Sequence, residues 1–248
     1  MKKAWVVAVD MGYGHQRPAF ALRHIAFKGK IISANDYPGI PELDQTLWRE
    51  TRRVYEFISK FKKVPVLGDL VFSLMDKVQE IKPFYPKERP LEPPGLQLRT
   101  IYGLIEKKQW GRHLMERLDE DPVPMICTFP VPGFMAEHWK YRGDIYLLVT
   151  DSDAARAWVP FFPKESKIRY LAPSQLVFER LLQYGVLKEK IAWFKKQIEP
   201  HDCGWMHTTI GGLNHRIKFL KKEIRKDRPK ETWIKGYNKW KEERCPHN

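Results

Sequence analysis

The feature that most constrains this chain is a series of short apolar runs that alternate with helix-forming segments. The runs span residues 4–9, 124–128, 144–151 and 168–172 and show little polar alternation. Runs of this kind suit strands that are buried on both faces. Strands that alternate with helices indicate a parallel sheet. The sequence therefore predicts the α/β fold class, a Rossmann-like parallel sheet flanked by helices.

Other elements are expected from helical periodicity and from turn residues. Ser174 is a candidate N-cap, because its hydroxyl oxygen can accept a hydrogen bond from the first turn of a helix. The expected elements are a strand over 30–34, a Pro-rich interruption over 83–94, and helices over 16–26, from 41 onward, over 68–81, 97–118 and 133–139, and from Ser174 to about 184.

The turn after the first strand carries Gly12, Gly14 and His15. Ligands of open α/β sheets gather at the carboxyl ends of the strands. Glycines allow the backbone to approach a ligand closely, and free N–H groups at a helix start favour an anion. We therefore expect His15 to face the crevice, with an ordinary strand-to-helix turn and a hydrogen-bonded histidine as the alternative.

A dinucleotide site is a second interpretation of the same turn. Gly12 and Gly14 match the start of the fingerprint, and Asp36 follows at roughly the 20 residues expected for a ribose-binding acid. Arg17 stands where the third glycine belongs, and Pro18 follows it. This departure argues against a nicotinamide cofactor, and we expect no cofactor.

A later strand ends in Thr150 and Asp151, with Trp158 a few residues beyond. These side chains fall where an open sheet presents groups to a ligand. A carboxylate at this place can orient an imidazole or hold a hydroxyl. An aspartate after a strand is also a common turn residue, so both interpretations stay open.

The net charge of +14 lies in two segments, with +6 in residues 49–117 and +7 in residues 195–248. Basic and aromatic residues interleave in the helical segment 49–118, which is typical of a surface that docks on an anionic membrane. The alternative is that the aromatic residues belong to the core. The same basic segments also suit binding to the phosphates of nucleic acid.

Three scattered cysteines, Cys127, Cys203 and Cys245, do not form a disulfide framework. The last two lie near His201, His207 and His247, but without paired CxxC spacing, so no metal site is expected. No run approaches the roughly 18 apolar residues of a membrane span. The expected location is the cytoplasm.

Motifs in serial order resemble the N-terminal half of the monogalactosyldiacylglycerol synthase and processive diacylglycerol glucosyltransferase family, which has the GT-B fold and is more distantly related to MurG-type transferases. The matching residues are Gly12-Tyr13-Gly14-His15 with Ala19, Val149-Thr150-Asp151 with Trp158, Tyr170-Leu171-Ala172-Pro173-Ser174, Gly185-Val186 and Lys190-Ile191.

The resemblance implies an N-terminal domain that binds a lipid acceptor and docks on the membrane. It implies that His15 is the base for the acceptor hydroxyl, with Asp151 as a secondary polar group. An imidazole with a pKa of ~6.5 suits this role. Substrate contacts are expected from the turn glycines, the strand-end threonine and the nearby indole: Gly12, Gly14, Thr150 and Trp158.

Family members continue into a second domain that binds the nucleotide sugar, whereas 54 residues follow Phe194 here. We expect residues 1–194 to form the acceptor-binding domain and 195–248 a basic helical appendage, with helices near 213–226 and 231–243. The donor domain is then expected in a separate subunit, or missing from this reading frame.

The expected function is the acceptor half of an enzyme that transfers a sugar from a nucleotide sugar to a diacylglycerol-type lipid, peripheral on the inner face of the membrane. A non-catalytic membrane or lipid-binding module is the alternative. A basic nucleic-acid-binding protein is the third interpretation.

Overall fold

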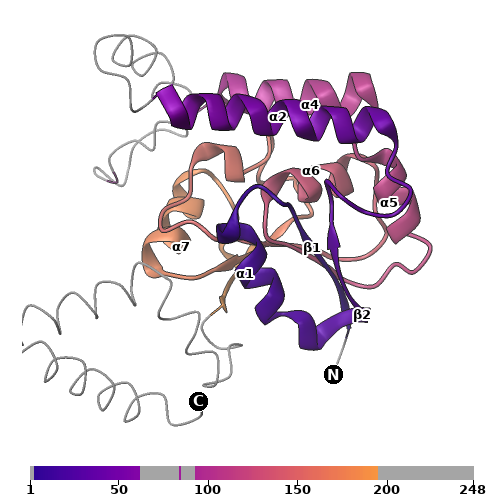
Figure 1. Ribbon diagram of the computed structural model, residues 1–248. Helices are drawn as coiled ribbons and strands as arrows, with labels where there is room; N and C mark the ends of the chain where they lie inside the picture. Colours follow the sequence, from indigo (N-terminus) through magenta and orange to yellow (C-terminus); the bar gives the residue numbers. More distant parts are fainter. Residues whose placement is uncertain (1–2, 62–83, 85–92, 195–248) are drawn as a thin grey trace, which may run out of the picture. The chain divides into compact units, whose positions relative to one another are not determined.

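A computed structural model describes residues 3–61, 84 and 93–194 of the chain (Figure 1). Within them, a parallel sheet has the strand order β2-β1-β3-β4-β5-β6. This confirms the predicted α/β, Rossmann-like architecture. The strands are β1 (Ala4–Ala8), β2 (Ala26–Ser33), β3 (Met125–Cys127), β4 (Ile145–Leu148), β5 (Arg169–Ala172) and β6 (Ile191–Trp193).

Helices fill the connections between these strands. They are α1 (Tyr13–Ala21), α2 (Glu42–Phe61), α4 (Leu96–Lys108), α5 (Arg112–Leu118), α6 (Pro130–His138) and α7 (Gln175–Gln183), with short 3-10 turns η1 (Arg23–Ile25), η2 (Arg156–Trp158) and η3 (Lys188–Lys190). Because β2 and β3 flank β1 on opposite sides, right-handed crossovers place α1 and α6 on opposite faces of the sheet. In Figure 1, α4 and α5 lie beside α6, and α1 lies below them.

The core follows from the apolar runs. Every residue of β1 is buried, and Val7 at its centre pairs with Ile32 of β2 and Cys127 of β3. Helix α6 is apolar along most of its length and buries seven consecutive residues against β3 and β4. Burial on both faces explains why these strands show no polar alternation.

The predicted single helix over 97–118 is wrong, because the chain breaks it into α4 and α5. Gln109 and Gly111 both adopt the left-handed conformation, with φ of 53° and 80°. A left-handed residue ends a helix, and glycine adopts it without a steric cost. The Gly111 turn also packs closely against Met135, which leaves no room for a side chain.

Other boundaries also differ from expectation, among them the start of α6 at Pro130 instead of 133. Helix α1 starts at Tyr13, three residues earlier than predicted, so His15 lies inside its first turn. Strand β2 starts at Ala26 and includes an irregularity opposite β1 between Ala4 and Val6. The predicted cap is confirmed, because the Ser174 hydroxyl accepts a hydrogen bond from the backbone N–H of Val177 at 3.2 Å.

Several expectations fall outside the described residues: the helix over 68–81, most of the Pro-rich segment 83–94 and the tail helices. The chain divides into two units, Met1–Trp193 and Phe194–Asn248. In the described part of the chain, no helix combines the length and the apolar character needed to cross a membrane.

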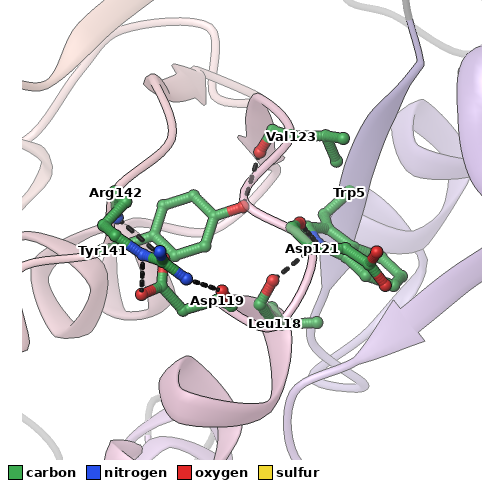
Figure 2. A network of polar contacts seen from close by, with 7 residues as sticks. All are labelled: Trp5, Leu118, Asp119, Asp121, Val123, Tyr141 and Arg142. Atoms are coloured by element: carbon green, nitrogen blue, oxygen red, sulfur yellow. Dashed lines mark hydrogen bonds and ion pairs between the residues drawn. The ribbon is translucent and has the colours of Figure 1, made fainter.

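A polar network fixes the amino-terminal edge of the sheet (Figure 2). The Trp5 indole donates to the carbonyl oxygens of Leu118 and Asp121, at 3.0 and 2.9 Å. Arg142 donates through Nε to Oδ2 of Asp119 at 2.8 Å. The connections before β3 and β4 are thereby tied to the start of β1.

Candidate functional site

The candidate site lies at the carboxyl edge of the sheet, between β1 and β3. The strand order reverses at this point, because β2 lies on one side of β1 and all later strands lie on the other. Crevices at such a switch point are the usual ligand sites of open α/β sheets. Gly12 starts α1 there with a φ of 119° and a ψ of 163°, a conformation that is essentially restricted to glycine.

His15 is held through one ring nitrogen. Its Nδ1 lies 2.9 Å from the carbonyl oxygen of Thr128 and 2.9 Å from the hydroxyl oxygen of Thr150. A carbonyl oxygen only accepts, so Nδ1 carries the proton in this contact. The Thr128 hydroxyl donates in turn to the carbonyl oxygen of His15 at 2.7 Å. The imidazole is therefore fixed as the tautomer whose Nε2 holds a lone pair.

Nε2 of this imidazole has no hydrogen-bond partner among the residues that the structure describes. Burial lowers the pKa of His15 below its ordinary value of 6.5, since the charged form is poorly solvated in the crevice. The negative charge of Asp151 and the hydrogen bond to Thr128 oppose this shift. His15 is consequently neutral, and able to accept a proton, at physiological pH.

Aromatic side chains surround the ring of His15. Phe129 meets it edge-on with 4.8 Å between the ring centroids, and the indole of Trp158 lies 6.4 Å away. Trp158 is only 3% exposed, and its Nε1 donates to Oδ2 of Asp151 at 2.7 Å. Trp158 thus orients Asp151 and has little surface left for a ligand.

The turn that carries Trp158 is itself anchored by buried groups. The guanidinium of Arg156 donates to the carbonyl oxygens of Val159 and Pro160, the latter at 3.1 Å. The Tyr170 hydroxyl donates to the carbonyl oxygen of Trp158 at 3.0 Å. These contacts hold the indole of Trp158 in place. The indole in turn holds the carboxylate of Asp151, whose charge raises the pKa of His15.

A polar rim borders the site on the β2 side. The Gln16 side-chain amide donates to Oδ1 of Asp10 at 2.6 Å, and the Asp10 backbone N–H donates to Oδ1 of Asn35 at 2.8 Å. Arg52 of α2 lies 4.0 Å from Oδ2 of Asp10, with both side chains about half exposed. The rim offers donors and acceptors to a hydroxylated ligand.

The structure brings together four of the predicted site residues, His15, Asp151, Thr150 and Trp158, around one imidazole. Gly12 forms the turn. Gly14 is exposed in the first turn of α1, with open space where a side chain would begin. Pro18, four residues later, lacks the N–H that a helix would direct to the Gly14 carbonyl oxygen.

Thr128 and Phe129 are site residues that the sequence reasoning missed. They directly follow β3, as Thr150 closely follows β4, so a polar residue at each strand end was the available signal. Arg17 stands where the dinucleotide-binding motif has its third glycine, and its guanidinium lies over the ring of Tyr13.

No metal cluster occurs in the part of the chain that the structure describes. Cys127 is fully buried in β3, and desolvation raises the pKa of its thiol. The thiol is therefore not an activated nucleophile. The histidines and cysteines of the tail lie outside the described residues.

Comparison with protein-family models, with curated proteins and with solved structures finds no match for this chain. A neutral imidazole with a fixed Nδ1–H and an available Nε2 at a switch-point crevice is equipped for general-base catalysis.

Proposed function

We propose that this chain is the acceptor-binding half of a GT-B-type glycosyltransferase, in which His15 activates the hydroxyl group of a diacylglycerol-type lipid. The nucleotide sugar would be bound by a domain outside residues 1–194. The observation that carries the proposal is the double anchoring of Nδ1 of His15 by Thr128 and Thr150, which directs the lone pair of Nε2 to the ligand.

In the proposed reaction, Nε2 of His15 takes the proton of the acceptor hydroxyl. The hydroxyl oxygen forms a bond to the anomeric carbon of the sugar, and the bond from that carbon to the diphosphate oxygen breaks. The nucleoside diphosphate leaves with the electron pair. Asp151 stabilises the imidazolium by its charge, because a nearby carboxylate favours the protonated form.

The polar rim supports a hydroxylated acceptor. Asp10, Gln16 and Asn35 lie around the same turn, and their side chains donate and accept hydrogen bonds. We propose that they contact the glycerol end of the acceptor, while the exposed Gly14 leaves room for it beside the helix start.

The first test measures sugar transfer to the lipid. A cell extract supplies the subunit that binds the nucleotide sugar. Extract from source cells lacking this chain is mixed with the purified protein, diacylglycerol vesicles and a labelled UDP-hexose, and labelled glycolipid is measured. We expect the wild-type chain to restore transfer and His15→Ala to reduce it by about 100-fold or more, the usual contribution of a general base. His24→Ala is the matched control, since His24 is an exposed histidine in the adjacent turn η1. Full transfer by His15→Ala would refute the base assignment.

A second test uses the isolated protein. Imidazole NMR of His15 is expected to show a proton on Nδ1 and a pKa below 6.5. Asp151→Asn removes a charge that raises this pKa, so the pKa of His15 is expected to fall further. A His15 pKa at or above the ordinary value of 6.5 would contradict the described environment.

A further inference from the structure

Helix α1 has two faces with different surroundings. His15 points inward to Thr128 and Thr150, and Ala19 is buried. Tyr13 and Phe20, seven residues apart, lie on the other face, since residues spaced by three, four or seven share one side of a helix. The Tyr13 side chain is 74% exposed and that of Phe20 is 58% exposed.

An arginine covers each exposed ring. The guanidinium carbon of Arg17 lies 5.6 Å from the ring centroid of Tyr13, and that of Arg23 lies 4.4 Å from the ring centroid of Phe20. We call Tyr13, Arg17, Phe20 and Arg23 the arginine–aromatic face. In the sequence, residues 11–35 contain four Lys and Arg residues and no Asp or Glu, and one of the four, Lys28, forms an ion pair with Asp121.

We propose that the arginine–aromatic face docks on an anionic lipid surface. Tyrosine favours the headgroup depth of a membrane, and phenylalanine belongs to the apolar face that interfacial helices bury at the boundary with the acyl chains. Arginine side chains extend along such rings and place their charge among lipid phosphates. The inference names the surface through which the proposed enzyme meets its membrane, and in this respect it rests on the proposed function.

Other occupants fit this face less well. The basic tail, with a charge of +7 over 195–248, and a second copy of a chain with a charge of +14 both carry the same sign of net charge as Arg17 and Arg23, which disfavours their docking on this face. Seven residues of helix separate the two rings by about 10 Å along the axis. That separation is too large for the rings to stack on neighbouring bases, which are about 3.4 Å apart along a strand. A membrane contacts the two aromatic rings and the two arginine side chains at the same time.

The test measures sedimentation of the full chain with vesicles of phosphatidylcholine, with and without phosphatidylglycerol. Neither diacylglycerol nor nucleotide sugar is present. We expect the double variant Arg17→Gln/Arg23→Gln to bind anionic vesicles more weakly by about 25-fold, because each basic side chain near an anionic surface contributes about fivefold. We expect Tyr13→Ser/Phe20→Ser to weaken binding to a similar extent.

Matched controls exist on other elements. Lys164→Gln/Lys188→Gln removes the same charge from exposed positions, and Phe162→Ser removes an aromatic ring that is 68% exposed. We expect both controls to bind nearly as the wild type does. Thermal unfolding of each variant shows that the fold is retained.

Equal losses in the face variants and the controls would overturn the inference, since binding would then follow total charge alone. Loss of single-stranded oligonucleotide binding at physiological salt, with vesicle binding unchanged, would overturn it in favour of nucleic acid. Because no sugar transfer is measured, the result is independent of the base assignment. His15→Ala is expected to bind vesicles as the wild type does.

Discussion

At the scale of single residues, Gly12 and His15 depend on one another. The backbone at Gly12 turns from β1 into α1 through a conformation that side chains disfavour, and His15 enters the crevice three residues later. The position of the imidazole is thus set by a backbone turn and by two threonine contacts. Neither contact comes from a residue near His15 in sequence.

Gly12→Ala tests this dependence. We expect it to lower the free energy of unfolding by about 1–3 kcal/mol, the cost of holding a non-glycine residue at such dihedral angles. The control is Gly14→Ala, because Gly14 is helical and has open space at its Cβ position. Alanine is the better helix former, so this control should be neutral or slightly stabilising. Urea unfolding measures both, and equal effects would contradict the described turn.

The sequence was sufficient to nominate His15, Thr150 and Asp151, because each follows or closely follows an apolar run. It was insufficient for Thr128, whose backbone carbonyl, rather than its side chain, meets the imidazole Nδ1. Every residue type has a backbone carbonyl oxygen, so the sequence does not reveal which one accepts this hydrogen bond. The burial of Trp158 was also missed, since an indole after a strand suits a ligand contact and a core position equally.

At the scale of elements, most strands and helices could be predicted because apolar runs and helical periodicity differ clearly in this chain. The break between α4 and α5 could not, because Gln109 is rarely left-handed and the periodicity continues across it. The helix ends there because the turn packs against Met135 of α6. This contact lies between segments remote in sequence.

Asp44 links α2 to the same turn. Its carboxylate Oδ2 accepts a hydrogen bond from the backbone N–H of Gly111 at 3.2 Å, and the residue is only 5% exposed. Burial raises the pKa of Asp44, although the bond from Gly111 and the nearby His113 oppose the shift. The ionised form therefore carries a solvation cost in the folded protein.

Two variants separate the hydrogen bond from the charge. Asp44→Asn keeps an acceptor for Gly111 and removes the ionisable group, so we expect unchanged or greater stability at pH 7. Asp44→Ala leaves the Gly111 N–H buried without this acceptor, and should lower the free energy of unfolding by about 1–3 kcal/mol. Chemical denaturation of both variants is the measurement. Equal losses would show that the carboxylate charge itself stabilises the turn.

At the scale of the whole molecule, the partly buried imidazole of His15 makes stability depend on pH. Burial lowers the pKa of His15 in the folded state relative to about 6.5 in the unfolded chain. As the pH falls through 6.5, the unfolded state gains a proton that folded His15 does not take up, so stability decreases. The contribution of His15 is thus present above pH 6.5 and lost below it.

His15→Gln should remove this contribution. Urea unfolding between about pH 7.5 and 5.5 is expected to show a smaller loss of stability for His15→Gln than for the wild type, with a difference in slope of at most about 1.4 kcal/mol per pH unit. The remaining histidines are common to both proteins and cancel in the comparison. A difference between the two proteins that does not vary with pH would refute the lowered pKa.

The distance in sequence between His15 and its anchors has a consequence for synthesis. Thr128 lies 113 positions after His15, and Thr150 lies 135 positions after it. At a translation rate of about 5–20 residues per second, the ribosome adds the anchors only some 6–30 seconds after the histidine. During that interval the imidazole is an ordinary side chain of an incomplete sheet. Its low pKa and its fixed tautomer arise together, once β3 and β4 have joined β1.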